Sequence, residues 1–229
     1  MKNHAITWLG LAVLCSPSLV QAHVSIASGP AVAAQTQVVT FQVGHGCEGA
    51  DTSGIIVEIP EGVTSVRPST SDFGQVDVET DAAGAVVAVH WEKDEASILA
   101  ADGQFYQLEL RLKAPDAAFS SLVFPVHQTC TDKDGNVTVV DWVGEDESDE
   151  TVEPAPVLHI LPARFAGWNR YTLDSDIDDL STYFADAEIV WRGKAAYSVN
   201  PNTLDLIEAT EGTSSLGSLK KGDEIWVKY

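Results

Sequence analysis

Apolar and polar residues alternate over much of the chain between Gln35 and Leu161, and turn residues interrupt the alternation at short intervals. A period of two residues is typical of strands with one buried face. Segment 104–113 is the clearest case, because its apolar residues fall on one face and Gln107, Glu109 and Arg111 fall on the other. The other segments of this kind are Val39–Val43, Ile55–Ile59, Val87–Trp91, Leu122–Val126, Val137–Val143 and Val157–Leu161.

Short strands without intervening amphipathic helices are typical of a sandwich of two antiparallel sheets. We therefore predict an all-β fold, with an immunoglobulin-like or cupredoxin-like antiparallel β-sandwich over residues 23–163. The composition changes after Pro162, where Trp168, Trp191 and Trp226 accumulate. For residues 164–229 we predict a small β-rich module, with strands near 167–173, 187–198 and 223–229 and a short helix over 178–184.

The first 22 residues have the pattern of a secretory signal peptide. Lys2 supplies a positive charge, an apolar stretch follows from Ala5 to Val20, and the small residue Ala22 occupies the position before the cleavage site. The apolar stretch is short for a membrane span, and no second stretch is long enough to form an anchor. We therefore predict a periplasmic or secreted protein without a membrane anchor, whose mature chain begins at His23.

The charge balance is strongly acidic, with 34 Asp and Glu against 13 Lys and Arg and a formal net charge of -21. Such an excess of carboxylates repels phosphate backbones and anionic lipid, so a nucleic-acid partner is not expected. Seven of the acids lie between Asp141 and Glu153, a composition typical of a solvated loop. No nucleophile elbow, phosphate loop or recognisable pair of catalytic carboxylates is apparent, so we predict that the protein is not an enzyme.

Two cysteines, Cys47 and Cys130, remain once Cys15 leaves with the signal peptide. Exported proteins fold in an oxidising compartment, so a disulfide between them is the favoured interpretation. A pair of thiolate metal ligands is the alternative.

His23 carries candidate chemistry because, as the first residue, it offers two nitrogen ligands. Its free α-amine and its imidazole can chelate one metal ion, and neutral nitrogen ligands suit Cu(II) in a tetragonal geometry. The alternative is an ordinary surface terminus, or a cleavage site one or two residues away.

Several spaced motifs resemble the YcnI-like copper-binding domains of bacterial envelopes. They are AHVSI around His23, GHGCEGADTSGIIVEIPEGV from Gly44, DGQFYQLELRLKAP from Asp102, FPVHQTC from Phe124, and Trp142 within VVDWVGE. The resemblance covers residues 23 to about 161 and leaves the C-terminal module unassigned. It implies that the mature N-terminal histidine chelates Cu(II) as a single-histidine brace, completed by an acidic residue on a central strand and a nearby tryptophan.

Trp142 matches the tryptophan of this family, where an indole can cover the ion and donate a hydrogen bond to a carboxylate. The family's acidic residue falls at Gln107, whose amide is a neutral and weaker ligand. Glu109 lies two residues further on the same face of the strand and could serve if the brace is displaced. A solvent-facing polar row is the alternative for Gln107 and Glu109, and a core position is the alternative for Trp142.

The remaining histidines of the mature chain, His45, His90, His127 and His159, are treated as ordinary strand or loop residues. A second ligand among them would give the two-histidine brace of copper polysaccharide monooxygenases. We therefore predict a Cu(II)-binding protein that sequesters copper or delivers it to an acceptor protein of the envelope. The alternatives are a copper-dependent enzyme acting on polysaccharide and a metal-independent binding module of the envelope.

Overall fold

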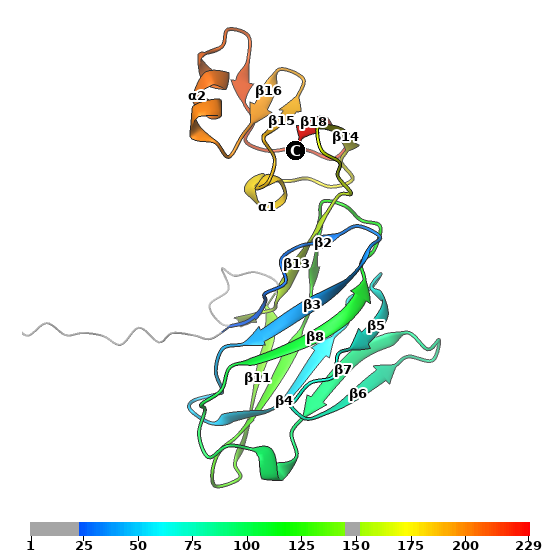
Figure 1. Cartoon of the computed structure of the whole chain (residues 1–229), viewed down its shortest axis with the longest axis vertical. Helices are drawn as coiled ribbons and strands as arrows, with labels where there is room; N and C mark the ends of the chain where they lie inside the picture. Colours follow the sequence, from blue (N-terminus) through cyan, green and yellow to red (C-terminus); the bar gives the residue numbers. More distant parts are fainter. Residues whose placement is uncertain (1–22, 145–151) are drawn as a thin grey trace, which may run out of the picture.

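The computed structural model describes residues 23–144 and 152–229. The predicted signal peptide at residues 1–22, with Cys15, lies outside the described residues, as does most of the acidic stretch between Asp141 and Glu153. The described chain forms a β-sandwich and a smaller C-terminal module, which lie one after the other along the longest axis of the molecule (Figure 1).

Two large sheets face each other in the sandwich. The first is four-stranded, in the order β1 (Val24–Ile26), β3 (Thr36–Val43), β8 (Tyr106–Lys113), β5 (Thr64–Pro68). The second is six-stranded, in the order β12 (Glu153–Pro154), β11 (Val137–Gly144), β10 (Val126–Thr131), β4 (Asp51–Glu58), β7 (Val86–Glu92), β6 (Gln75–Thr80). A short 3-10 helix, Glu95–Ser97, follows β7.

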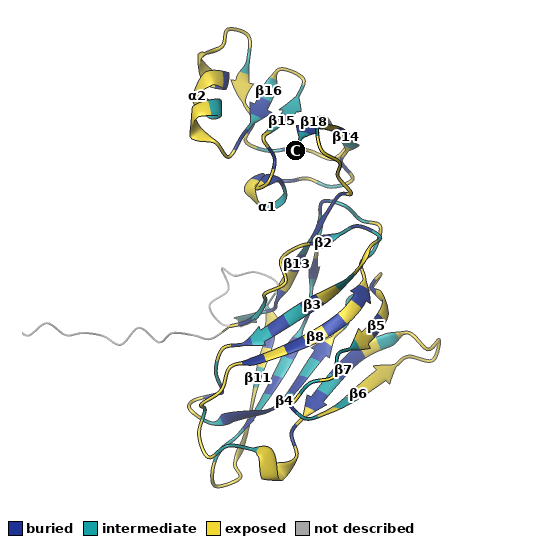
Figure 2. Cartoon of the chain, in the orientation of Figure 1, coloured by how far each residue is buried: buried dark blue, intermediate teal, exposed yellow. Residues whose placement is uncertain are grey.

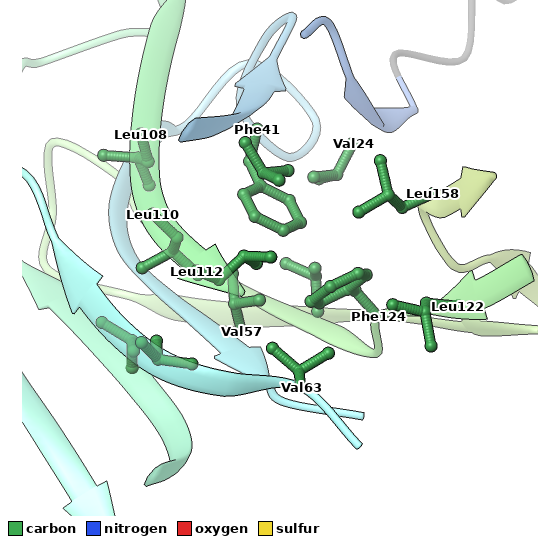
Figure 3. Close-up of a cluster of buried hydrophobic side chains, with 14 of the residues drawn as sticks. Val24, Phe41, Val57, Val63, Leu108, Leu110, Leu112, Leu122, Phe124 and Leu158 are labelled. Carbon is green, nitrogen blue, oxygen red and sulfur yellow. The ribbon is translucent and has the colours of Figure 1, made fainter. Parts of the chain in front are cut away.

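The alternation in the sequence produces the core of the sandwich. Along β8 every second residue from Tyr106 to Leu112 is buried and the residues between them are exposed, which Figure 2 shows as alternating colours. Side chains of both sheets meet in the space between them, where the Phe41 and Phe124 rings pack edge to face with centroids 5.4 Å apart (Figure 3). The sequence therefore predicted both the strand and its buried face.

A third, three-stranded sheet lies at the end of the sandwich nearest the C-terminal module, in the order β2 (Ala31–Val32), β13 (Val157–Leu161), β9 (Ser120–Val123). The predicted strand Leu122–Val126 is in fact two strands in different sheets, because the chain leaves β9 at Phe124 and enters β10 after Pro125. Most neighbouring strands are antiparallel, as predicted, while the short strands β2 and β12 add in parallel to β13 and β11.

The C-terminal module contains one five-stranded sheet and two helices. Its strands, in sheet order, are β14 (Trp168–Thr172), β18 (Glu224–Lys228), β15 (Ile189–Arg192), β16 (Ala195–Tyr197) and β17 (Ser214–Ser215). The predicted segment 187–198 is the hairpin of β15 and β16, and the predicted helix is the shorter α1 (Ser181–Phe184). Helix α2 (Pro201–Ala209) was not predicted, although Asn200 caps it by accepting a hydrogen bond from the Asn202 N–H (3.0 Å) and Pro201 opens it.

Phe119 joins the two parts of the protein. It precedes β9 and is buried among the apolar side chains of the C-terminal module, with its ring 5.5 Å from those of Tyr171 and Phe184. Its φ of 61° lies in the left-handed region, which is unfavourable for a bulky side chain. The packing around the ring offsets this cost, so the sandwich contributes an anchor to the core of the module.

Candidate functional site

His23 lies directly before β1, at the edge of the four-stranded sheet. Val24, the first residue of β1, is 2% exposed and fixes the start of the strand in the core, while the His23 side chain remains exposed. The centroid of the His23 ring lies 5.7 Å from a ring centroid of Trp142, and the planes are inclined by 53°. The structure thus brings together two residues that are more than a hundred positions apart in the sequence.

A chain of hydrogen bonds fixes Trp142. The indole is buried on β11, and its Nε1 donates to Oε1 of Gln128 on β10 (3.1 Å). Nε2 of Gln128 donates to Oγ1 of Thr52 (2.9 Å) and to the carbonyl oxygen of His45 (3.0 Å). The indole N–H is therefore bonded to an amide, and not to a carboxylate.

Gln128 is the residue of this site that the sequence analysis did not identify. It is 2% exposed and shares the buried face of β10 with Val126 and Cys130. A polar residue at a buried position of an alternating strand needs hydrogen-bond partners, and this position was the available signal.

The disulfide between Cys47 and Cys130 is present, which confirms the predicted pairing. Its Sγ atoms are 2.11 Å apart, and the backbone N–H of Cys47 also donates to Sγ of Cys130 (2.9 Å). Because Cys130 lies two residues after Gln128, the disulfide holds the loop that carries His45 against β10, close to the hydrogen bonds that support Trp142.

Gln107 and Glu109 lie on the exposed face of β8. Gln107 pairs with Gln42 on β3, which in turn pairs with Ser25 on β1, and Nε2 of Gln42 donates to Oγ of Ser25 (2.8 Å). Glu109 pairs with Thr40, two positions further from the end of the strand where His23 lies. Two residues of a strand span about 6.6–6.8 Å, so Gln107 is the nearer of the two to His23 along the sheet.

Both residues also line a cavity of about 450 Å³ beside the 69–73 segment. Lys93 and Tyr106 reach the same cavity from the interior of the sandwich. Nζ of Lys93 donates to Oδ2 of Asp51 (2.6 Å) and to the Tyr106 hydroxyl (2.7 Å), and the hydroxyl donates to Oδ1 of Asp51 (2.6 Å). This buried group was not predicted from the sequence.

The pKa of the Asp51 carboxyl reflects opposing effects. Burial alone raises it, but hydrogen bonds from the Leu99 N–H, Lys93 and Tyr106 stabilise the carboxylate, and the positive charge of Lys93 adds to them. These effects outweigh burial and lower the pKa of Asp51. Burial and the adjacent carboxylate raise the pKa of the Tyr106 hydroxyl, so the tyrosine stays protonated and acts as a donor.

The other histidines have separate partners. Nδ1 of His45 lies 2.7 Å from the Gly46 carbonyl oxygen, and Nε2 of His90 lies 3.2 Å from Oε2 of Glu79. His127 is on the face of β10 opposite Gln128, and His159 lies beside Tyr183 at the junction with the C-terminal module. Among residues 23–144 and 152–229, no group of three or more His, Cys, Asp or Glu side chains is arranged to hold a metal ion.

Residues 23–160 match a protein family described as a domain of unknown function, DUF1775. The chain belongs to this family. It is the YcnI-like family that the motifs around His23, Cys47, Gln107, Cys130 and Trp142 resemble, and the match ends before the C-terminal module. No curated protein matches the chain.

The chain is also similar to solved structures. An uncharacterized protein from Nocardia farcinica with an immunoglobulin-like fold is 26% identical, with a TM-score of 0.50, and the match covers 61% of this chain and 98% of that one. A cohesin–dockerin complex (Coh-OlpA-Doc918) of Clostridium thermocellum has 12% identity and a TM-score of 0.38, over 61% of this chain and 98% of that one. The immunoglobulin-like description of the first agrees with the two facing sheets described here.

In the part of the chain that the structure describes, no helix has the length and apolar character needed to cross a membrane.

Proposed function

We propose that the mature protein binds Cu(II) through the α-amine and imidazole of His23, and that it sequesters copper or delivers it to an acceptor protein in the bacterial envelope. The observation that carries this proposal is the placement of the His23 ring 5.7 Å from Trp142. The family resemblance assigns a role to the same two residues, which are distant in the sequence and come from different sheets.

The surroundings of His23 suit a chelate that is open on one side. The histidine is exposed, so an acceptor protein can reach a bound ion, while Trp142 closes the other side with an indole held by Gln128. The excess of carboxylates over the whole chain favours local enrichment of cations. Protons compete for both nitrogen ligands, so copper binding is expected to weaken at acid pH.

The register of β8 supports Gln107 as the third ligand in this proposal. Gln107 lies opposite Gln42 on β3, which in turn lies opposite Ser25 on β1, so Gln107 is nearer than Glu109 to the end of the sheet where His23 lies. A neutral amide stabilises a divalent ion less than a carboxylate does, so the site is expected to bind copper more weakly than one with glutamate here and to release it more easily. In this proposal residues 164–229 supply no ligand.

A pair of reciprocal substitutions tests this assignment. Gln107→Glu is expected to raise the Cu(II) affinity of the processed protein by at least about tenfold, which corresponds to about 1.4 kcal/mol. Glu109→Gln is the matched control, because it changes an exposed residue of the same strand and is expected to leave the affinity unchanged. Isothermal titration with Cu(II) measures both, and a loss of affinity confined to Glu109→Gln would assign the ligand to Glu109 instead.

Trp142 provides a spectroscopic test of the same site. Cu(II) bound at His23 is expected to quench the fluorescence of the nearby indole, and Trp142→Phe is expected to remove most of this response while copper remains bound. Trp168→Phe is the control, because Trp168 lies in the C-terminal module. Unchanged quenching in Trp142→Phe would place the bound ion away from this tryptophan.

A further inference from the structure

Large aromatic side chains are exposed in the C-terminal module. Phe165 is 77% exposed, Trp168 53% and Trp226 48%. Among the described residues, Phe105 in the sandwich is the one other aromatic residue of comparable exposure. An indole that leaves half of its surface in water is unusual in a small domain, and such groups mark interaction sites when they gather together.

The strand register places three tryptophans on the same face of the sheet. Trp226 on β18 is paired with Trp191 on β15 and, on its other side, with Arg170 on β14. Trp168 lies two residues before Arg170 on β14, so it points to the same face and is the diagonal neighbour of Trp226. Directly opposed Cβ atoms are about 4.5–5.5 Å apart and diagonal ones about 7–8 Å, so the three indoles form a row across three adjacent strands.

The opposite face of this sheet forms the core of the module. Ile225 and Val227, the neighbours of Trp226 along β18, are fully buried and pack in the cluster that contains Phe119. The core of the module therefore accounts for one face of the sheet and leaves the tryptophan row on the other.

The loop beside the row is held rigidly. Asn169, itself 8% exposed, accepts a hydrogen bond from the Phe165 N–H (2.9 Å) and donates to the carbonyl oxygens of Phe165 (2.7 Å) and Gly167 (3.0 Å). Gly167 and Tyr229 exchange two backbone hydrogen bonds, which close the loop onto the end of β18. The backbone beside Trp168 is thus held in place before any ligand binds, which reduces the entropic cost of binding.

The charges around the row are internally balanced. Nε of Arg170 donates to Glu224 (2.9 Å), and Lys228 forms an ion pair with Glu188. The cations beside the indoles are therefore neutralised by their own carboxylates, on a chain with a net charge of -21. This pattern does not match nucleic acid or anionic lipid, both of which need unpaired basic residues.

We propose that this face binds a neutral polysaccharide chain. Sugar rings are apolar on their faces and carry hydroxyl groups at their edges, so they match flat indoles flanked by charged hydrogen-bonding groups. Trp168, Trp191 and Trp226 stack against the sugar rings of the chain, and the Arg170–Glu224 and Lys228–Glu188 pairs bond to the hydroxyl groups. Because this proposal concerns the C-terminal module alone, it does not depend on copper binding.

The test uses the whole mature chain and three neutral polysaccharides: cellulose, chitin and amylose. Depletion of the protein from solution measures binding to the insoluble polymers, and tryptophan fluorescence measures binding to the soluble one. The unmodified protein is expected to bind at least one of them, and Trp168→Ala with Trp226→Ala is expected to lower the affinity by at least about tenfold. Trp168→Phe with Trp226→Phe keeps aromatic rings at both positions and is expected to retain most of the binding.

Leu206→Ala is the matched control, because Leu206 is a large exposed side chain of the same module, on α2 (67% exposed). Both double variants change exposed side chains, so their thermal unfolding is expected to match that of the unmodified protein, which separates lost binding from lost folding. Failure of the unmodified protein to bind any of the three polymers would overturn the proposal. Self-association, or binding to phospholipid vesicles, that is lost in the double alanine variant while the polymers remain unbound would assign the face to a second copy or to a membrane instead.

Discussion

At the scale of single residues, the structure distinguishes groups that face solvent from groups that are buried together. Asp51 and Lys93 are both buried, and each depends on the other because a lone charge in the interior of a protein is strongly destabilising. The Tyr106 hydroxyl bonds to both, and Nζ of Lys93 lies 4.3 Å from the centre of the Tyr106 ring. These three residues join β4 and β8, which belong to different sheets.

Replacing Lys93 tests the importance of this pair. Lys93→Met leaves a buried carboxylate without its cation and is expected to lower the free energy of unfolding by about 3–5 kcal/mol. Urea unfolding measures the loss, and adding Asp51→Asn is expected to recover part of it. Lys133→Met, which removes an exposed ion pair with Asp134, is the control and is expected to cost about 1 kcal/mol or less. Equal effects of the two lysine substitutions would contradict the account.

Asp51 also makes the stability of the fold depend on pH. Its pKa is lower in the folded protein than in the unfolded chain, where the usual value is 3.8. The stability that it contributes is therefore present above this value and is lost as the pH falls through the folded-state pKa.

His127 is expected to make the stability of the fold depend on pH in the opposite direction to Asp51. Its Nδ1 lies 2.6 Å from Oδ1 of Asp141 and its Nε2 lies 3.0 Å from Oε1 of Glu58. The hydrogen bond to Asp141 contributes most to raising the pKa of His127; partial burial opposes this rise, and Glu58 adds to it. The stability contributed by this histidine is thus complete below the unfolded value of about 6.5 and is lost as the pH rises through the folded-state pKa.

The comparison of His127→Gln with the unmodified protein measures this contribution. The difference in unfolding free energy is expected to be larger at about pH 5.5 than at about pH 8.5, because the protonated imidazole is lost over that interval. Asp141→Asn removes the main cause of the raised pKa of His127 and is expected to reduce the pH dependence of this difference in unfolding free energy. A difference that stays constant between the two pH values would refute the assignment.

At the scale of strands and helices, the sequence predicted what depends on local alternation. Strands such as β4, β7 and β8 have one buried apolar face, so their positions and orientation were readable. In β11 the position was readable but the orientation was not, because Val137 and Val139 are exposed and Trp142 faces the core. Strands β1, β2, β5, β6 and β12 were not predicted, because they are short or lie at sheet edges, where pairing with a neighbour determines the structure more than composition does. Leu122–Val126 looked like one strand because Phe124 is buried in the core even though the chain changes sheet there.

In the candidate site, too, residues whose role depends on distant partners were not predicted. The family resemblance identified His23 and Trp142, and the structure brings them together. Gln128 was missed because its role comes from partners on β4, on β11 and in the loop after β3. The buried Asp51 was missed for the same reason, since its neutralising partner Lys93 is 42 positions away.

Phe119 connects the sandwich to the C-terminal module. Phe119→Ala removes a buried ring from the core of the C-terminal module and is expected to lower the free energy of unfolding of that module by about 3–5 kcal/mol. The φ of 61° suits alanine only slightly better than phenylalanine, so relief of backbone strain does not offset the loss. Protection of the backbone N–H groups of β18 from hydrogen exchange measures the effect, and undiminished protection would show that the ring does not anchor the module.

At the scale of the whole molecule, the protein combines a family domain with a further module. The immunoglobulin-like sandwich holds His23 and Trp142 at one edge, while the C-terminal module lies at the end of the long axis and packs around Phe119. The proposed copper and polysaccharide sites are on different parts of the chain. Such an arrangement would hold a copper-binding protein close to a surface rich in glycans.

The most direct test of the copper proposal is a Cu(II) titration of two versions of the protein, one beginning at His23 and one with a single glycine before it. The extension preserves every side chain but converts the α-amine of His23 into an amide, so one arm of the chelate is lost. The extended protein is expected to bind Cu(II) at least about tenfold more weakly, and removal of the glycine is expected to restore the affinity. Equal affinity of the two versions would contradict the chelate at His23.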